Sequence, residues 1–394
     1  MAVAAAAHGV GGARPRVPAS WAVPTWLYVL AALVIAMVAV GGATRLTGSG
    51  LSITEWRPVT GALPPLSEQA WLTEFEKYRQ IPQYEIVNQG MSLAEFKFIY
   101  AWEWSHRQLG RLIGLVFFVP LAWFWLRSEI RGRMALTLLG IGALGGLQGA
   151  IGWIMVASGL QPGMTAVAPI KLTLHLVMAS LIFASLIWIA AGLKPVRPEP
   201  AWHGLSHRIP GILMGLVLVQ IALGGLVAGS RAGLTYNTWP LMDGTLVPSA
   251  SSLFVVVPWI ENFVDNVLLV QFNHRMAAYA IVALALWHAW SIFRLAPRSR
   301  AASRAMVIAG LTLTQMMLGI VTLVLAVPLW AGLAHQVFAM MVLGMCVVHC
   351  RISRAEGSRA AQGGGPDASQ SFDARGRLEP PYAGTSLKDG HGTI

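Results

Sequence analysis

Eight uncharged or nearly uncharged runs, each long enough to cross a membrane, constrain the fold of this chain more than any other feature. Crossing roughly 30 Å of hydrocarbon takes about 20 helical residues. The runs are 24–43, 106–126, 134–157, 172–193, 209–229, 275–293, 305–327 and 329–350. Only 11% of the 394 residues are charged, whereas a soluble domain carries roughly 25%. The sequence therefore predicts an all-α integral membrane protein with eight transmembrane helices.

The basic residues between the runs predict which way the helices face. They form five sets: Arg14 and Arg16; Arg127, Arg131 and Arg133; Lys194, Arg197 and Arg208; Arg294, Arg298, Arg300 and Arg304; and Arg351, Arg354 and Arg359. Cytoplasmic loops are enriched in Lys and Arg, and all five sets fall on one side of the membrane. Both termini are therefore expected in the cytoplasm. Residues 1–23 lack the apolar core of a signal peptide, so the first helix is expected to be retained.

The net charge of +11 follows mostly from this topology. Nucleic-acid binding would need a soluble basic domain, and the sequence contains none, so the expected surroundings are the lipid bilayer and no nucleic acid. Both cysteines, Cys346 and Cys350, lie about one helical turn apart in the last run. This placement excludes an extracytoplasmic disulfide framework.

An internal repeat divides the chain into two similar halves. Residues 41–65, GGATRLTGSGLSITEWRPVTGALPP, resemble residues 224–248, GGLVAGSRAGLTYNTWPLMDGTLVP. The register continues further along, since Gln148 and Gly152 correspond to Gln315 and Gly319. Each half holds an even number of spans, so both enter the membrane in the same direction, related by a pseudo-two-fold axis along the membrane normal. The predicted fold is two tandem four-helix bundles.

The runs and the repeat set the expected boundaries of the parts. Residues 1–23 form a cytoplasmic N-terminal segment, 24–193 the N-terminal bundle, 194–208 a cytoplasmic linker and 209–350 the C-terminal bundle. Residues 351–394 are expected to be a disordered cytoplasmic tail, because most of them are Gly/Ser/Pro/Asp-rich and cannot bury a core.

Four histidines stand at matching places in the two halves, each expected at the extracytoplasmic start of an even-numbered helix. They are His106 and His175 in the first half and His274 and His335 in the second. An imidazole at membrane depth is costly and usually lines a site. Two at equal depth on neighbouring helices can hold a metal, and bis-histidine haem ligation suits an apolar four-helix bundle.

Two other interpretations of these histidines are considered, an interfacial position and a zinc site. Some of them can be interfacial residues bonded to a loop. Zinc is disfavoured, because no carboxylate or cysteine is spaced to complete a tetrahedral site.

Arginines accompany the histidines in both halves. Arg107 and Arg275 each follow a histidine directly, and Arg111 comes one turn after Arg107. A guanidinium group suits bidentate binding of a carboxylate such as a haem propionate. Alternatively, an arginine at a helix end extends to the membrane interface.

A carboxylate distinguishes the first half from the second. Glu103 lies three residues before His106, so on a helix the two share a face. The corresponding residue of the second half is Gln271. A carboxylate can accept a proton or stabilise developing positive charge, which an amide does poorly. The first bundle is therefore interpreted as catalytic and the second as an electron-transfer site, unless Glu103 is a solvated acid paired with Arg107.

These residues resemble a known family, the haem A synthases, in the branch shared by alphaproteobacteria and mitochondria. The matching stretches are the repeat at 41–65, EFKFIYAWEWSHRQLGRLIGL, LTLHLVMA, VQFNHRMAAYAIV and LAHQVFAM, and they span residues 24 to about 350. The resemblance implies an enzyme of the cytoplasmic membrane that oxidises the C8 methyl group of haem O to a formyl group, giving haem A for the terminal oxidase.

The family's functional residues map onto named positions of this chain. By the resemblance, His274 and His335 ligate a tightly held haem b, His106 and His175 bind the substrate haem, and Glu103 is the catalytic carboxylate. Some members carry a cysteine pair in the first outer loop, whereas this sequence has none there, so a mechanism that needs that disulfide cannot operate.

The resemblance also implies the course of the reaction. The methyl group is oxidised twice, with water as the expected oxygen source, and a gem-diol then loses water. Electrons leave through haem b to an acceptor that the sequence does not identify. The oligomeric state is also left open, with a homo-oligomer among the alternatives, and haem O synthase is a candidate partner.

Two competing functions need no such enzyme. His288 and His349 each lie 14 positions after a candidate ligand, so the second bundle could stack two haems as a b-type transmembrane electron-transfer cytochrome. Against this, both are expected at the cytoplasmic interface, near Arg294 and Arg351, where a histidine is unremarkable. A transporter is disfavoured, because the helices lack the interruptions expected at a midplane binding site.

Overall fold

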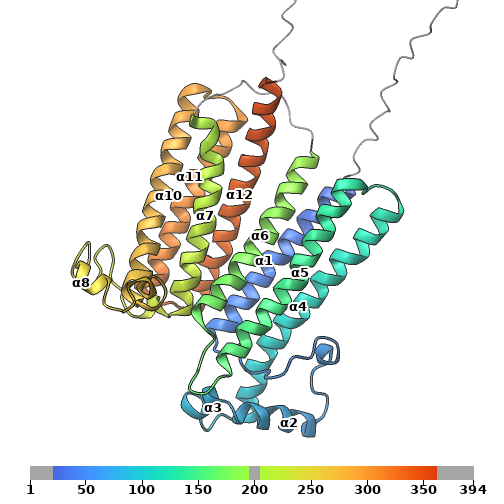
Figure 1. The fold of residues 1–394 in the computed structure, drawn as a ribbon, viewed down its shortest axis with the longest axis vertical. Coiled ribbons are helices and arrows are strands. Elements are labelled where there is room, and N and C mark those ends of the chain that lie inside the picture. The colour runs from blue at the N-terminus through green and yellow to red at the C-terminus, as the bar shows by residue number, and fades with distance from the viewer. Residues whose placement is uncertain (1–20, 195–204, 362–394) are drawn as a thin grey trace, which may run out of the picture.

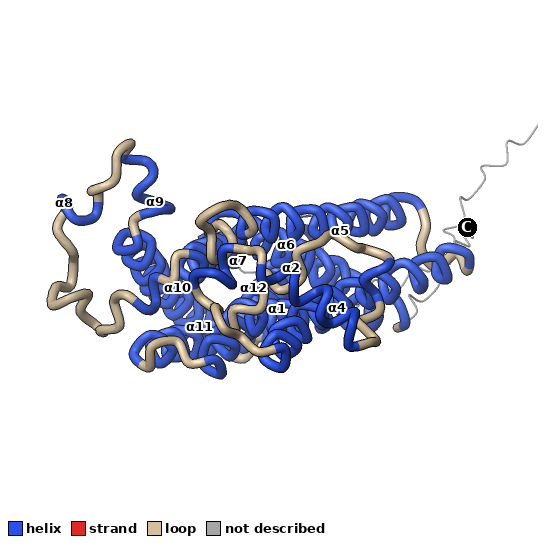
Figure 2. Tube along the Cα trace, turned by 90° about the horizontal axis from the view of Figure 1, so that it is seen from below, coloured by secondary structure: helices blue, strands red, loops and turns tan. Residues whose placement is uncertain are grey.

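The computed structural model describes residues 21–194 and 205–361 and contains eight long helices (Figure 1). Their bounds are α1 Ala22–Leu46, α4 Leu93–Leu126, α5 Gly132–Gly159, α6 Pro169–Leu193, α7 Leu205–Gly229, α10 Val267–Leu295, α11 Arg300–Val324 and α12 Leu329–Ala361. All eight are long and apolar enough to cross a membrane, which confirms the predicted membrane spans. Of the eight predicted runs, only 305–327 extends beyond its helix, because α11 ends at Val324. No strand occurs in the described residues (Figure 2).

The long helices form two sets of four that lie next to each other (Figures 1 and 2). In the first set α1 packs on α4 and α6, and α5 packs on α6 and less extensively on α4. In the second set α7 and α11 each pack on both α10 and α12. The sets meet through α1, α6, α7 and α12. The pseudo-two-fold relation between the two sets stays a prediction.

The helices that carry the four histidines lie opposite each other within each set. Helices α10 and α12 both pack on α7 and on α11 but not extensively on each other, and α4 and α6 share α1 and α5 in the same way. The expectation of neighbouring helices is therefore wrong. Opposite helices point side chains at one another across the bundle interior, which suits a group held from two sides.

Seven of the eight helices begin earlier than their apolar runs do, α12 being the exception. Ser92 accepts a hydrogen bond from the Glu95 N–H (3.3 Å), and Glu95 accepts one from the Ser92 N–H (2.8 Å), so a capping box starts α4 at Leu93. In α10, Asn266 accepts from the Leu268 N–H at 3.0 Å. His106 therefore lies more than three turns inside α4 rather than at its start. The prediction that the histidines mark helix starts is wrong for this residue.

Two long loops lie at the same end of the molecule (Figure 1). Residues 47–92 contain η1 Thr60–Ala62, α2 Glu68–Arg79 and α3 Pro82–Ile86, and residues 230–266 contain η2 Ala232–Leu234, α8 Ala250–Leu253, η3 Trp259–Glu261 and α9 Asn262–Asp265. The first loop has its own apolar core, in which Tyr78 and Leu51 pack near Phe96 of α4. This packing fixes the loop against the helix ends.

Two predicted boundaries need correction at the other end of the molecule. The predicted linker 194–208 is shorter, because α7 begins at Leu205. The predicted tail 351–394 is not disordered throughout, because α12 continues to Ala361. Most of segment 1–23, the linker part 195–204 and the tail part 362–394 lie outside the described residues.

The paired glycines of the repeat lie where the two sets of helices meet. Gly42 of α1 lies against Leu333 and Gln336 of α12, and Gln336 donates a hydrogen bond to the Val38 carbonyl at 3.2 Å. Gly225 of α7 lies so close to α6 that an added Cβ would come 3.1 Å from the Cα of Thr173. The backbone of each set thus comes into contact with a helix of the other, with side chains of α12 at Gly42 and with both the side chain and the Cα of Thr173 at Gly225.

Candidate functional site

The histidine pair of the second bundle has the spacing of two ligands to one metal. The ring centroids of His274 on α10 and His335 on α12 lie 6.5 Å apart, with the rings 75° from parallel. An imidazole nitrogen bonds a metal at about 2 Å, so a shared metal places two ring centres roughly 6 Å apart. The two side chains are partly buried among apolar helices. This arrangement fits a haem iron held between them.

Each of the four histidines rests against a glycine of an adjacent helix. An added Cβ would meet the ring Cε1 atom at 2.8 Å for Gly41 with His106, 2.8 Å for Gly152 with His175, 3.2 Å for Gly224 with His274 and 2.9 Å for Gly319 with His335. Non-bonded carbons prefer about 3.5–4.0 Å. A Cβ at Gly41, Gly152 or Gly319 would therefore displace the imidazole, and one at Gly224 would press on it, so glycine lets each imidazole lie close to a backbone.

A glutamine also contacts three of the histidines. The amide nitrogen donates to the histidine's own carbonyl oxygen at 3.0 Å, from Gln148 to His175, from Gln220 to His274 and from Gln315 to His335. The same nitrogen lies 3.1–3.3 Å from the nearer ring nitrogen. The sequence repeat paired Gln148 with Gln315 but did not identify Gln220. All three glutamines lie four residues before the glycine that faces the histidine, and this shared spacing is the signal that would have identified Gln220.

The first bundle holds His106 and His175 on the opposite helices α4 and α6. The Nδ1 atoms of both are buried and have no hydrogen-bond partner among the described residues. A buried polar atom without a partner is rare in native proteins. These atoms therefore fit a site whose remaining partner is a bound group.

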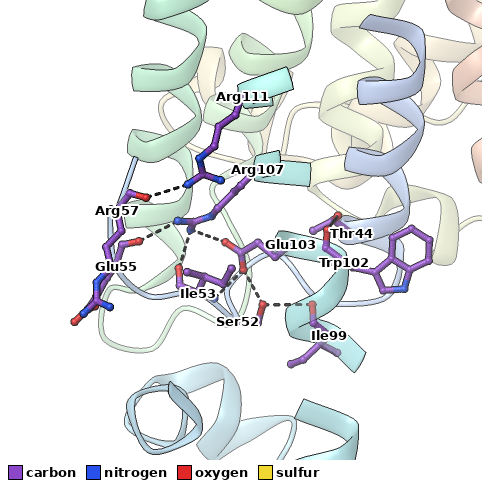
Figure 3. Close-up of polar contacts among 10 residues, drawn as sticks. All are labelled: Thr44, Ser52, Ile53, Glu55, Arg57, Ile99, Trp102, Glu103, Arg107 and Arg111. Atoms are coloured by element: carbon purple, nitrogen blue, oxygen red, sulfur yellow. Dashed lines mark hydrogen bonds and ion pairs between the residues drawn. The ribbon is translucent and has the colours of Figure 1, made fainter. Parts of the chain in front are cut away.

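Glu103 lies at the centre of a hydrogen-bond network in the N-terminal half of α4 (Figure 3). Its Oε2 accepts from the Ser52 hydroxyl at 2.8 Å and from the Ile53 N–H at 2.9 Å. Its Oε1 accepts from Arg107 at 2.7 Å. The carboxylate is buried, with a relative exposure of 4%. The alternative interpretation of Glu103 was a solvated acid paired with Arg107. The ion pair is present, but the carboxylate is buried and not solvated.

The arginines of α4 tie the first long loop, residues 47–92, to the helix (Figure 3). Arg107 donates to the carbonyls of Ile53 (2.8 Å) and Glu55 (2.9 Å). Arg111 donates to the carbonyls of Arg57 (3.0 Å) and Pro58 (2.9 Å). The Nη1 atom of Arg111 is buried without a partner among the described residues. Arg111 thus keeps donor capacity for an anion, whereas Arg107 is engaged by Glu103 and the loop.

In each bundle a helix is hydrogen-bonded to the long loop that precedes it, and we call this set of contacts a junction. The junction of the second bundle, between α10 and residues 230–266, contains no carboxylate at the position of Glu103. Gln271 accepts from Arg275 at 2.9 Å and donates to the carbonyls of Ala232 (2.9 Å) and Tyr236 (3.2 Å). Arg275 also donates to the carbonyls of Tyr236 (3.0 Å) and Leu241 (3.3 Å), and its Nε is buried without a partner in the described part of the chain.

The two junctions differ in charge. In the first, the charge of Arg107 is balanced by Glu103. In the second, Arg275 meets only an amide at the corresponding position. A positive charge that the protein leaves unbalanced near a buried site favours an anionic ligand group such as a carboxylate.

His288 and His349 form a separate pair at the other end of the second bundle. Their Nε2 atoms are 2.9 Å apart, so one ring donates a hydrogen bond to the other, and Arg304 donates to His349 at 3.3 Å. Both histidines are fully buried within the protein, which the sequence did not indicate, and their placement at the cytoplasmic interface stays a prediction. A metal between two imidazoles needs roughly 4 Å between nitrogens, and this pair is closer than that.

Comparisons with known proteins identify relatives over most of the chain. A family model described as "Cytochrome oxidase assembly protein" matches residues 24–347. A protein named "Heme A synthase" from Methylobacterium sp. (strain 4-46) is 65% identical over 349 residues, covering 88% of this chain and 95% of that protein. A second of that name, from Methylobacterium nodulans, is 68% identical over 82% of this chain and 89% of its own length. A third, from Brucella ovis, is 51% identical over 84% and 91%.

Proposed function

The chain belongs to the cytochrome oxidase assembly family whose members include the haem A synthases, and on this premise we propose that it oxidises the C8 methyl group of haem O to a formyl group. Its function is the synthesis of haem A for cytochrome oxidase. It is an enzyme of a bacterial membrane, and haem is its substrate. The overall change converts a methyl group and water into a formyl group, four protons and four electrons. The site must therefore provide a route out for the protons and another for the electrons.

We assign the two bundles different roles. His274 and His335 are proposed to ligate a resident haem b, and His106 and His175 the substrate haem. The single observation that carries this division is that Glu103 of the first bundle stands where Gln271 stands in the second, in otherwise similar junctions. Bound haem b supplies one-electron redox chemistry.

Glu103 is proposed as the catalytic carboxylate. An ionised carboxylate offers about four lone-pair positions, and Ser52, Ile53 and Arg107 fill three of them. One position remains to accept a proton or to face developing positive charge. The three donors hold both oxygens in place, so the group is already oriented before substrate binds.

Propionate binding is proposed for Arg111 in the first bundle and Arg275 in the second. Each keeps a buried N–H without a partner in the described residues, and neither faces a carboxylate of the protein. Arg107 was predicted to bind the substrate haem as well. Its contacts favour an indirect contribution, in which it orients Glu103 and holds the outer loop.

The proposed location is the bacterial inner membrane, with both termini in the cytoplasm and the haem sites toward the periplasm. The positive-inside distribution of Lys and Arg supports this orientation. The long loops and the four histidines then lie toward the periplasm. Haem O synthase is the proposed supplier of substrate, and the electron acceptor and the oligomeric state are left open.

The decisive experiment is to express the chain with a source of haem O in a host that lacks haem A. Haems are then extracted and separated by chromatography. Haem A should appear only with the intact chain. Absence of haem A, in cells where the chain is inserted and haem O is present, would refute the proposed function.

A further inference from the structure

One of the four histidine positions lacks the glutamine found at the other three. Each histidine faces a glycine, and the residue four positions before that glycine is Gln148, Gln220 or Gln315 in three cases. Before Gly41, which faces His106, the residue is Met37. Four positions is about one helical turn, so this residue lies on the same helix face as the glycine.

The glutamines are well placed to hold their histidines. In each case the amide nitrogen bonds the histidine carbonyl, while the amide oxygen is buried and has no partner among the described residues. A metal-ligating histidine almost always donates its second ring N–H to an acceptor, which fixes the ring and raises its basicity. In the structure the amide nitrogen is the atom that lies against the ring. A half-turn of the amide, which exchanges its oxygen and nitrogen, would present the unpartnered oxygen to the ring as the acceptor that this role requires.

Met37 cannot do the same for His106. A thioether donates no hydrogen bond and accepts only weakly. Met37 is partly buried, and its methyl carbon lies 3.4 Å from where a Cβ on Gly110 would be, one turn after His106 on α4. The Met37 side chain therefore lies beside the turn of α4 that carries His106, and no side-chain amide bonds His106 in the described part of the chain.

We propose that Met37 makes His106 the exchangeable ligand of the substrate haem, because it replaces the glutamine that holds each of the other three histidines. The inference rests on the proposed function, since it takes His106 as an iron ligand. The glutamines and Met37 are positioning residues, because they act through the histidines.

This difference matches what each site must do. A resident haem b needs two ligands fixed in place, and both histidines of the second bundle have a glutamine. A substrate haem must bind and leave in each catalytic cycle. One ligand held by a glutamine, His175, would orient it, while His106, which no glutamine holds, would let it go.

The test is to exchange the residues at these positions and measure haem retention. Met37→Gln, Met37→Leu and Gln315→Met are purified as full chains with their haem b, loaded with haem O and washed in detergent. The haems that remain are extracted and quantified over time. Second-shell partners typically change metal affinity by roughly 10–100-fold. Met37→Gln should therefore slow haem O loss by at least about 10-fold and leave haem b unchanged.

The other two variants make the result specific. Met37→Leu keeps the size without a hydrogen-bonding group and should release haem O as the unmodified chain does. Gln315→Met should speed haem b loss by roughly 10–100-fold and raise the haem b midpoint potential, since a less basic imidazole favours the reduced iron. The haem b spectrum reports folding in the Met37 variants.

Three results would overturn the inference. The first is equal haem O loss from Met37→Gln and the unmodified chain. The second is weakened haem O binding in Met37→Leu, which would assign the thioether a direct contact with the substrate. The third is unchanged haem b retention and potential in Gln315→Met. If the unmodified chain converts haem O while one of these occurs, the inference fails and the proposed function stands.

Discussion

Gly319 of α11 lies so close to His335 of α12 that an added Cβ would come 2.9 Å from the imidazole Cε1. Gly319→Ala should therefore push His335 out of its position. Overpacking typically costs about 1–3 kcal/mol, or roughly 5- to 150-fold in binding. We expect haem b retention to fall by this amount, measured by the reduced-minus-oxidised spectrum during washing.

Gly310→Ala is the matched control for this prediction. Gly310 lies on the same helix with nothing within 4 Å of an added Cβ. Alanine in a helix interior is about 0.5–1 kcal/mol more stable than glycine, so this variant should keep its haem b. Equal retention in both variants would contradict the importance of the glycine contact.

Glu103→Gln should abolish most conversion of haem O and leave haem b in place. General acid–base groups typically contribute about 10²–10⁴-fold, and the amide has no equivalent proton-accepting oxygen. Haem O should accumulate, as extraction and chromatography would reveal. Glu76→Gln, on an exposed acid that pairs only with Arg79 in the described contacts, is the control. Loss of haem b from Glu103→Gln with normal conversion would show that the roles of the bundles are exchanged.

Arg107→Leu should destabilise the end of the first bundle that carries the loop 47–92, because it leaves Glu103 as a buried unpaired charge. Breaking a buried pair in this way costs about 3–5 kcal/mol. The double variant Arg107→Leu/Glu103→Gln should be more stable than the single one, since the amide carries no charge and can still accept from Ile53. Thermal unfolding and protease cleavage within residues 47–92 measure both effects. A double variant less stable than Arg107→Leu would argue against charge as the cause.

His288→Ala tests the remaining alternative, a second haem in the same bundle. We expect haem b content and conversion to be unchanged, because His288 bonds His349 directly. The variant should lose about 1–3 kcal/mol, since it removes a hydrogen bond from a buried ring. The haem-to-protein ratio of the purified chain decides the matter. A ratio that falls on His288→Ala would favour the electron-transfer cytochrome.

The eight helices could be predicted because a membrane span needs a long apolar run, and few other structures do. The residues at which the helices begin could not be predicted in this way. An apolar run ends at the membrane surface, whereas a helix can continue beyond it. Ser92 and Glu95 form the serine-to-glutamate capping pattern, so the sequence did carry a signal for the start of α4. The same limit explains the extension of α12, whose residues 351–361 are polar and still helical.

The histidines could be located from the repeat, but their arrangement across each bundle could not. Hydropathy says which residues are in the membrane and nothing about which helix packs on which. The burial of the His288 and His349 pair was missed for the same reason. Glu103 was singled out by its contrast with Gln271, whereas its bonds to Ser52 and Ile53 depend on how the loop folds back onto α4.

The glycine contacts between the two sets of helices have a consequence for electron flow. Gly42 and Gly225 bring a backbone of each set against a helix of the other, and close-packed interiors deform little. Under the proposed function, an electron leaving the substrate for haem b crosses a gap whose width is fixed by the chain itself. The tunnelling rate between the two porphyrins would then be a property of the folded protein, insensitive to changes in the thickness or fluidity of the surrounding lipid.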